Sequence, residues 1–243
     1  MVMRHIRTWW HSAVPLLFPK KSDMEEVKDT LMVLSGGMDS TTMLYKYASR
    51  IDLAVNFTYG SNHNERELEC ARYHCNALGI ELLVIDLSFI GTHFHSSLLE
   101  GADAIPDGEY DFDNMKSTVV PFRNGIMLAA AAGLAESHGL STIMIANHAG
   151  DHALYPDCRK AFVDAMALAI KEGTYEGIRL EAPFTLLSKT DIARIGKELG
   201  VDYTKTYSCY RGLEHHCGTC GTCRERREAL AEAGIDDKTV YDD

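Results

Sequence analysis

Short apolar runs alternate with helical patterns along most of the chain. Runs of strand length predict five strands, at 31–34, 53–59, 82–87, 142–146 and near 178–182. Strands that are separated by helices in this way are typical of a parallel sheet covered on both faces. The pattern therefore predicts an α/β fold with a doubly wound parallel sheet.

Two of the helices between these strands are indicated most clearly. One runs from Asn124 to His138, where an alanine-rich stretch ends at Gly139, a residue that suits a helix C-terminus. Another is expected to begin after Ser188, a good N-cap residue, and to end before Gly200.

Other segments do not follow this alternation. Residues 88–117 show no clear period, and we expect an irregular excursion over the active-site face. The first 27 residues surround a short apolar run interrupted by Pro15, too short for a signal peptide or a membrane span, and should form a flexible extension. We expect an α/β domain over 28–205 and a small lobe with a C-terminal helix over 206–243.

Composition and charge narrow the class of protein. A chain of 243 residues, 46% hydrophobic and 24% charged, suits one soluble domain with a small appendage. Its 35 acidic and 24 basic residues give a formal charge of -11, which repels polyanions, so no nucleic-acid partner is expected. We recognise no export signal and expect no membrane partner. We expect a cytoplasmic protein, so its seven cysteines should be reduced, and cysteines that cluster indicate a metal site rather than disulfides.

A glycine-rich turn follows the first predicted strand. The string Ser35-Gly36-Gly37-Met38-Asp39-Ser40 stands between that strand and a helical pattern. Glycines let the backbone approach a ligand, and a helix N-terminus offers unpaired N–H groups, so the arrangement suits a phosphate. No lysine follows the glycines as it would in a Walker loop. The string instead resembles the Ser-Gly-Gly-x-Asp-Ser loop of the ATP pyrophosphatases, which bind pyrophosphate while AMP is transferred.

Four cysteines gather near the C-terminus, at Cys209, Cys217, Cys220 and Cys223. Two overlapping CxxC steps after a first thiol can close a tetrahedral zinc site, and four protein ligands would make that zinc structural. An iron–sulfur cluster is served equally well by four thiols, and one of the two histidines just before Cys217 could replace a thiol. The spacing predicts one metal centre per chain and favours zinc.

Four further strings decide which family the chain resembles. They are Val119-Val120-Pro121-Phe122-Arg123-Asn124, Tyr155-Pro156-Asp157-Cys158-Arg159, Leu187-Ser188-Lys189 and Ser208-Cys209-Tyr210-Arg211-Gly212. With the loop and the cysteines, they resemble the 7-cyano-7-deazaguanine synthase family of N-type ATP pyrophosphatases, in order and spacing, from about residue 31 to residue 235. The resemblance implies a Rossmann-like, adenine nucleotide alpha hydrolase-like fold with a small C-terminal zinc-binding lobe.

The same resemblance implies an activity. It is the ATP-dependent conversion of 7-carboxy-7-deazaguanine and ammonia to the nitrile, with release of AMP and pyrophosphate, in queuosine biosynthesis. A carboxylate is a poor electrophile, so adenylation first makes it reactive, and the resulting amide needs a second activation to lose its oxygen. ATP with Mg²⁺ would be the co-substrate and zinc would be structural. A homodimer that acts on small molecules is also implied.

Roles for individual residues follow from the resemblance as well. Ser35, Asp39, Ser40, Arg123 and Lys189 would take part in catalysis, with Lys189 neutralising phosphate charge. Substrate contacts would come from Asn124, Asp157 and Arg159, because a carboxylate suits purine N–H donors and a guanidinium suits an anion. Phe122 departs from the family pattern, in which glycine is usual. The ATP-binding segment would comprise Leu34, Ser35, Gly36, Gly37, Met38, Asp39, Ser40, Thr41, Thr42, Met43 and Leu44.

Three other functions stay open at this point. An RNA thiolase of the same class would need a basic surface, against which the charge balance argues. A protein-modifying relative could transfer the same adenylated intermediate to a protein amine. A zinc module that only binds partners through 209–223 would leave the Ser-Gly-Gly loop without a purpose.

Overall fold

The computed structural model describes residues 27–108, 115–152 and 154–243. Nearly all of the predicted N-terminal extension therefore lies outside the described residues. Five parallel strands form one sheet in the order β3-β2-β1-β4-β5. The strands are β1 (Thr30–Val33), β2 (Ile51–Thr58), β3 (Glu81–Asp86), β4 (Thr142–Met144) and β5 (Arg179–Glu181). Each predicted strand is confirmed within two residues of its expected ends.

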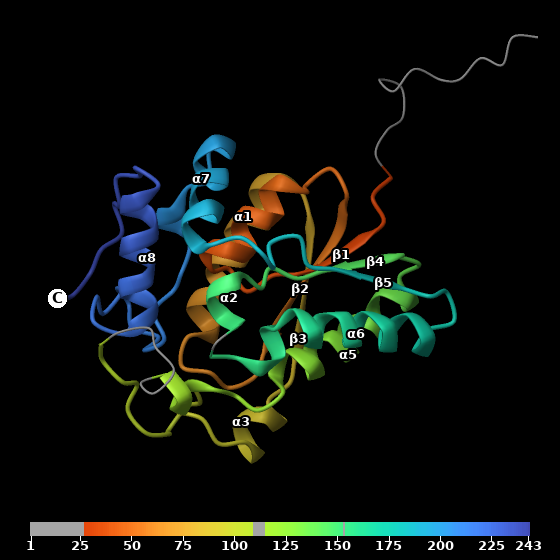
Figure 1. Ribbon diagram of the computed structural model, residues 1–243, viewed down its shortest axis with the longest axis horizontal. Helices are drawn as coiled ribbons and strands as arrows, with labels where there is room; N and C mark the ends of the chain where they lie inside the picture. The colour runs from red at the N-terminus through yellow and green to blue at the C-terminus, as the bar shows by residue number, and fades with distance from the viewer. Residues whose placement is uncertain (1–26, 109–114, 153) are drawn as a thin grey trace, which may run out of the picture.

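Helices cover both faces of this sheet, so the doubly wound arrangement is confirmed (Figure 1). The side chains of adjacent strand residues point to opposite faces, and Leu31 and Met32 accordingly belong to two separate core clusters. Leu31 packs in the cluster of α5 and α6, whereas Met32 packs in the cluster of α1, α2 and α7. These helices are α1 (Met38–Lys46), α2 (Asn64–Leu78), α5 (Arg123–Ser137), α6 (Lys160–Gly173) and α7 (Lys189–Leu199).

Both helices predicted from the sequence are present. Helix α7 begins with a capping box: Ser188 Oγ accepts a hydrogen bond from the Asp191 backbone N–H at 3.1 Å, and Asp191 Oδ2 accepts one from the Ser188 N–H. The helix ends at Gly200, whose φ of 72° lies in the left-handed region that favours glycine. The capping box therefore fixes the position of Lys189, the first residue of the helix.

Helix α5 is unusually apolar. The stretch Lys116–Ser137, which contains it, is long and apolar enough to cross a membrane by length and composition. In this fold the buried side of α5, including Met127, Leu128 and Ala131, packs in the same core cluster as strand residue Val55. Core helices of water-soluble proteins have the same composition, so the stretch is explained by its packing on the sheet.

The segment 88–117 is only partly irregular, which corrects the expectation. It contains a short helix, α3 (Phe89–His93), and a 3₁₀ turn, η1 (Lys116–Thr118). Ile90 and Leu98 are completely buried, but they are too far apart to produce a helical or strand period. Residues 109–114 lie outside the described residues. Asp107 forms an isolated β-bridge with Cys220, which places this part of the segment beside the cysteine cluster.

The C-terminal region consists of short turns and one helix. They are η4 (Tyr203–Lys205) and α8 (Gly221–Glu232); two further 3₁₀ turns, η2 (Ala149–His152) and η3 (Pro156–Cys158), lie between β4 and α6. Helix α8 packs against α7, and its Leu230 lies in a core cluster with Met38 and Ala193. The helix that follows the cysteines therefore joins the C-terminal region to the domain, as the sequence predicts.

Arg226 is the largest fully buried side chain among the described residues and connects three segments. Its guanidinium donates hydrogen bonds to the Tyr203 carbonyl, the Thr206 hydroxyl at 2.8 Å and the Thr239 hydroxyl at 3.0 Å. We expect Arg226→Met to lower the free energy of unfolding by about 3 kcal/mol, because these buried acceptors lose their donor. Urea unfolding measures the change, and the exposed Arg72→Met is the control. Equal stability of the two variants would contradict this role.

Candidate active site

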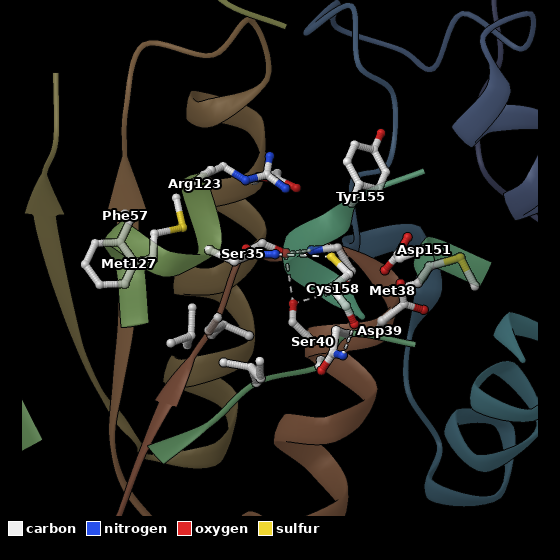
Figure 2. A pocket seen from close by; sticks show the side chains of 18 of the residues that line it. Ser35, Met38, Asp39, Ser40, Phe57, Arg123, Met127, Asp151, Tyr155 and Cys158 are labelled. Atoms are coloured by element: carbon white, nitrogen blue, oxygen red, sulfur yellow. Dashed lines mark hydrogen bonds between the residues drawn. The ribbon is translucent and has the colours of Figure 1, made fainter. Parts of the chain in front are cut away.

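A pocket opens at the carboxyl ends of β1 and β4, which are neighbours in the sheet although far apart in the chain. Here the strand order changes direction, and parallel α/β sheets bind ligands at such switch points. Its walls include Val33 at the end of β1, Leu34 and Ser35 just after it, and Ile145 and Ala146 after β4. Figure 2 shows Arg123 and Met127 on one side of the pocket and Asp39 and Asp151 on the other.

The Ser-Gly-Gly turn is held by its own hydroxyl groups. Ser35 Oγ accepts a hydrogen bond from the Gly37 N–H at 3.1 Å and lies 3.0 Å from Ser40 Oγ. Gly36 has φ 102°, and a Cβ at that position would lie 2.1 Å from the Glu67 carbonyl oxygen, so only glycine fits. Among the described residues no side chain caps the N-terminus of α1, which leaves N–H groups of its first turn available for an anion.

The predicted ATP-binding segment divides into two parts. Its first part lines the pocket: Leu34, Ser35, Gly37, Met38, Asp39 and Ser40. Its last four residues, Thr41 to Leu44, are buried within α1 instead. Thr42, for example, has its hydroxyl 2.8 Å from that of Tyr203. Their contribution is to hold the helix in place behind the turn.

Charged side chains meet next to this turn. Lys189 Nζ lies 2.6 Å from Glu225 Oε2 and 3.6 Å from Asp39 Oδ2. Burial alone would lower the pKa of Lys189, but Asp39 and Glu225 together raise it above its usual value, so the ammonium stays charged. His148 Nε2 lies 3.6 Å from both Asp39 Oδ2 and Asp151 Oδ1. Since its Nδ1 accepts the Gly150 N–H at 3.0 Å, the proton of the neutral ring is on Nε2.

The carboxylate of Asp39 has one oxygen that is not used in this group. Its Oδ1 is buried and has no hydrogen-bond partner among the described residues. Magnesium in nucleotide sites is usually held by one or two carboxylates together with phosphate oxygens and water. Asp39 and Asp151, which share the His148 ring nitrogen, fit that donor set.

Arg123 supplies a second positive charge, from the first residue of α5. Its Nη1 donates to the Tyr59 hydroxyl at 2.9 Å, the one hydrogen bond of this guanidinium among the described residues. Burial acts to lower the pKa of Arg123, but Tyr59, Tyr210 and Asp157 raise it well above its usual value. The guanidinium therefore stays charged, with donors left for an anionic ligand.

Two titratable groups that sequence reasoning missed lie in the wall formed by the start of α2. Burial, reinforced by Arg123, lowers the pKa of His63 to about 3, so the imidazole is neutral. Glu67 Oε2 lies 3.8 Å from its Nε2, and the neutral ring makes this a contact without an ion pair. Burial raises the pKa of Glu67 to about 8, although Arg123 opposes the rise.

The three predicted substrate residues are not all in the pocket. Asn124 lines it, whereas Asp157 and Arg159 are outside the lining. Asp157 Oδ2 accepts a hydrogen bond from the Asn124 backbone N–H at 2.8 Å, and its carbonyl accepts one from Asn124 Nδ2 at 3.3 Å. Asp157 therefore braces the start of α5. Direct contact of Asp157 and Arg159 with the substrate stays a prediction.

Phe122, the departure from the family pattern, has the left-handed backbone conformation that glycine favours. Its φ of 55° is the one positive value of a non-glycine residue among the described residues, and such a conformation costs about 1 kcal/mol. The ring is 58% exposed and meets Phe162 edge to face, with 5.7 Å between the ring centroids. It does not line the pocket, so this substitution leaves the lining unchanged.

The four predicted metal ligands come together. The sulfur atoms of Cys209, Cys217, Cys220 and Cys223 are buried and lie within 4.8 Å of one another. Cys220 Sγ is 3.4 Å and Cys217 Sγ 3.9 Å from Cys223 Sγ. Tetrahedral thiolates around one zinc ion would be about 3.8 Å apart, given Zn–S bonds of about 2.3 Å. Hydrogen bonding from Cys209 and Cys223 lowers the pKa of Cys220, which favours a thiolate.

The metal centre is also connected to the pocket. Helix α8 begins with Cys220 as its N-cap, and Glu225 follows two residues after Cys223. It is Glu225 that binds Lys189. The cysteine cluster thus fixes the helix that positions a charged residue of the pocket, a connection that no local motif indicates.

The whole sequence can now be compared with the sequences of known proteins. Residues 29–234 match the family model described as queuosine biosynthesis protein QueC. A 7-cyano-7-deazaguanine synthase from Porphyromonas gingivalis W83 is 60% identical over 219 residues, which cover 90% of this chain and all of that protein. One from Desulfotalea psychrophila is 48% identical, over 88% of this chain and 98% of that protein.

A solved structure of NMN synthetase from Francisella tularensis is more distant. Its TM-score is 0.49 at 13% identity, and the alignment covers 87% of this chain and 79% of that one. Family membership rests on the sequence matches, which extend across nearly all of the described chain and include both the pocket and the cysteine cluster. The chain belongs to the QueC family of queuosine biosynthesis proteins.

Proposed function

We propose that this protein is a carbon–nitrogen ligase that converts 7-carboxy-7-deazaguanine and ammonia to 7-cyano-7-deazaguanine, with cleavage of ATP to AMP and pyrophosphate. The observation that carries the proposal is the uncapped N-terminus of α1 behind the Ser-Gly-Gly turn, in a pocket that also contains the two partly buried cations Lys189 and Arg123. Relatives that are 60% and 48% identical are named 7-cyano-7-deazaguanine synthase, which supports the substrate.

In this proposal the turn and the start of α1 bind the phosphates of ATP. The N–H groups of the first turn and the Ser35 and Ser40 hydroxyls would stabilise the pyrophosphate as it leaves. Lys189, which stays charged beside Asp39 and Glu225, would neutralise the same developing charge. Asp39 and Asp151 would hold the Mg²⁺ that accompanies ATP, and the metal supplies charge neutralisation of the phosphates.

The other wall would receive the substrate. Arg123 keeps donors for its carboxylate, and Asn124 stands beside it in the lining. Asp157 would act by holding Asn124 in place, in addition to the contact with purine N–H donors that the resemblance implies. Arg159, the N-cap residue of α6, would bind an anionic group of a substrate, as the resemblance implies.

We further propose that the four cysteines hold one structural zinc ion. The short sulfur–sulfur distances support one shared ion, whereas an iron–sulfur cluster would place the thiolates on different irons. The family resemblance supports three further parts of the proposal. The chain would divide into an α/β domain over 28–205 and a zinc-binding lobe over 206–243, the protein would form a homodimer, and it would be located in the cytoplasm. The charge of -11 supports small-molecule substrates rather than nucleic acid.

The proposal is tested by asking which acceptor triggers ATP cleavage. With ATP, Mg²⁺ and the free carboxylated heterocycle, AMP should form without tRNA or a second protein. A requirement for added tRNA would favour an RNA-modifying enzyme. A heterocycle that ends up attached to polypeptide would favour the protein-modifying alternative.

A further inference from the structure

Ammonia presents a chemical problem that the residues assigned so far do not solve. At neutral pH it exists mainly as ammonium, which has no free electron pair and cannot attack an acyl adenylate. A site for ammonium therefore needs an acceptor for the cation and for one of its protons. We propose that Glu67 binds ammonium in the pocket and takes a proton from it; this inference rests on the proposed function.

The position of Glu67 is fixed against the phosphate-binding turn. Its carbonyl oxygen occupies the space where a Cβ of residue 36 would lie, and a Cβ on Gly37 would be 3.8 Å from Glu67 Oε1. The first turns of α1 and α2 thus meet at the glycines. The carboxylate consequently lines the pocket beside the glycines of the turn that would bind the phosphates of ATP.

The carboxylate is partly buried and faces the pocket without a matching partner. Its side chain is 17% exposed, and among the described residues it accepts no hydrogen bond from protein groups. The nearest ring nitrogen is that of His63 at 3.8 Å. The acceptor capacity of this carboxylate is therefore left for a ligand cation or a proton.

The other groups around Glu67 do not satisfy it. His63, at the start of the same helix, is neutral. Cys70, one turn further along α2, also stays neutral, because burial raises the pKa of its thiol. Arg123 on α5 is charged and acts on Glu67 from a distance, but its one hydrogen bond among the described residues goes to Tyr59, and it forms no ion pair with Glu67 there. Tyr207 and Tyr210 line the same pocket. The ionised form of Glu67 can accept a small cation, and a bound ammonium would favour that form over the protonated one that a pKa of about 8 gives at neutral pH.

The proposed step balances. One N–H bond of ammonium breaks and its proton passes to Glu67, which frees the nitrogen electron pair. A nitrogen–carbon bond then forms at the acyl carbon, and the carbon–oxygen bond to AMP breaks with its electron pair on the phosphate oxygen. The proton that the new amide nitrogen loses leaves on AMP. Glu67 returns its proton to solvent before the next turnover.

The test uses Glu67→Gln in the full chain, with Glu65→Gln as the matched control, since Glu65 is on the same first turn of α2 and exposed. At pH 7 and subsaturating ammonium, the amide-forming rate of Glu67→Gln should fall about 10²-fold. The deficit should shrink as the pH rises and free ammonia becomes abundant. Hydroxylamine, which is largely unprotonated at pH 7, should react in this variant far closer to the wild-type rate.

Heterocycle-dependent exchange of pyrophosphate into ATP separates this inference from the proposed function. The exchange needs no ammonium, so Glu67→Gln should reduce it far less than the amide-forming rate, and Glu67→Asp should recover part of the use of ammonium. Equal losses with ammonium and hydroxylamine, or an unchanged dependence on ammonium, would overturn the role of Glu67. If the wild-type protein shows no exchange with the heterocycle, the proposed function fails and the inference falls with it.

Discussion

Replacing Asp39 by Asn should reduce AMP formation by about 10²-fold or more while the fold is retained. The carboxylate faces Lys189 and His148 through Oδ2, and its Oδ1 is buried without a hydrogen-bond partner. An amide of the same shape keeps the packing but removes the charge that would hold Mg²⁺ and balance Lys189. Steady-state release of AMP and pyrophosphate measures the effect.

The control for this prediction is Asp164→Asn. Asp164 is 61% exposed on α6, where it pairs with Lys160, so the variant removes the same charge away from the pocket. We expect its rate to equal that of the wild type. Similar rates for the Asp39 and Asp164 variants, with equal melting temperatures, would mean that Asp39 has no part in handling phosphate.

Removal of the metal should have the largest effect on stability. Structural zinc contributes on the order of 10 kcal/mol to the folding of the segment that binds it. Chelation, or Cys220→Ser, should therefore unfold the region from Cys209 onward and lower the melting temperature. Activity should fall as well, because Glu225 would no longer be held beside Lys189.

Elemental analysis and thermal unfolding check this prediction together. One zinc per chain is expected in the wild type and much less in Cys220→Ser. The matched control is Cys75→Ser, a cysteine buried in α2 outside the cluster, which should keep its zinc. Iron in place of zinc, or unchanged melting of the metal-free chain, would contradict the assignment.

Local patterns in the sequence explain why the fold could be predicted. All strands except the edge strand β5, which reads Arg-Leu-Glu, are mainly apolar runs. The Ser188 capping box and the glycines at 139 and 200 determine where helices begin and end. The short helix and the turn within 88–117 were not predicted, because the buried residues of this segment are scattered. Their burial depends on tertiary contacts, including the bridge from Asp107 to Cys220, that no local period records.

Sequence patterns indicated those parts of the candidate site whose functional residues all lie in one short segment. The Ser-Gly-Gly turn and the cysteine spacing are such segments, and the structure places both where a ligand could bind. Glu67 lines the pocket, whereas His148 and Glu225 contact the lining residues Asp39 and Lys189 from behind. The three come from distant parts of the chain and match no motif, so only the fold brings them together. Asp157 illustrates the opposite case, since its motif was recognised but its carboxylate braces Asn124.

The central claim is that this protein makes a nitrile from a carboxylated purine analogue. The most direct test is mass spectrometry of the products formed from 7-carboxy-7-deazaguanine, ATP, Mg²⁺ and ammonium. We predict the amide first and then 7-cyano-7-deazaguanine, with two AMP and two pyrophosphate released for each nitrile. Without ammonium, neither the amide nor the nitrile should form. A heterocycle that is recovered unchanged while ATP is cleaved, or a reaction that stops at the amide with excess ATP, would contradict the claim.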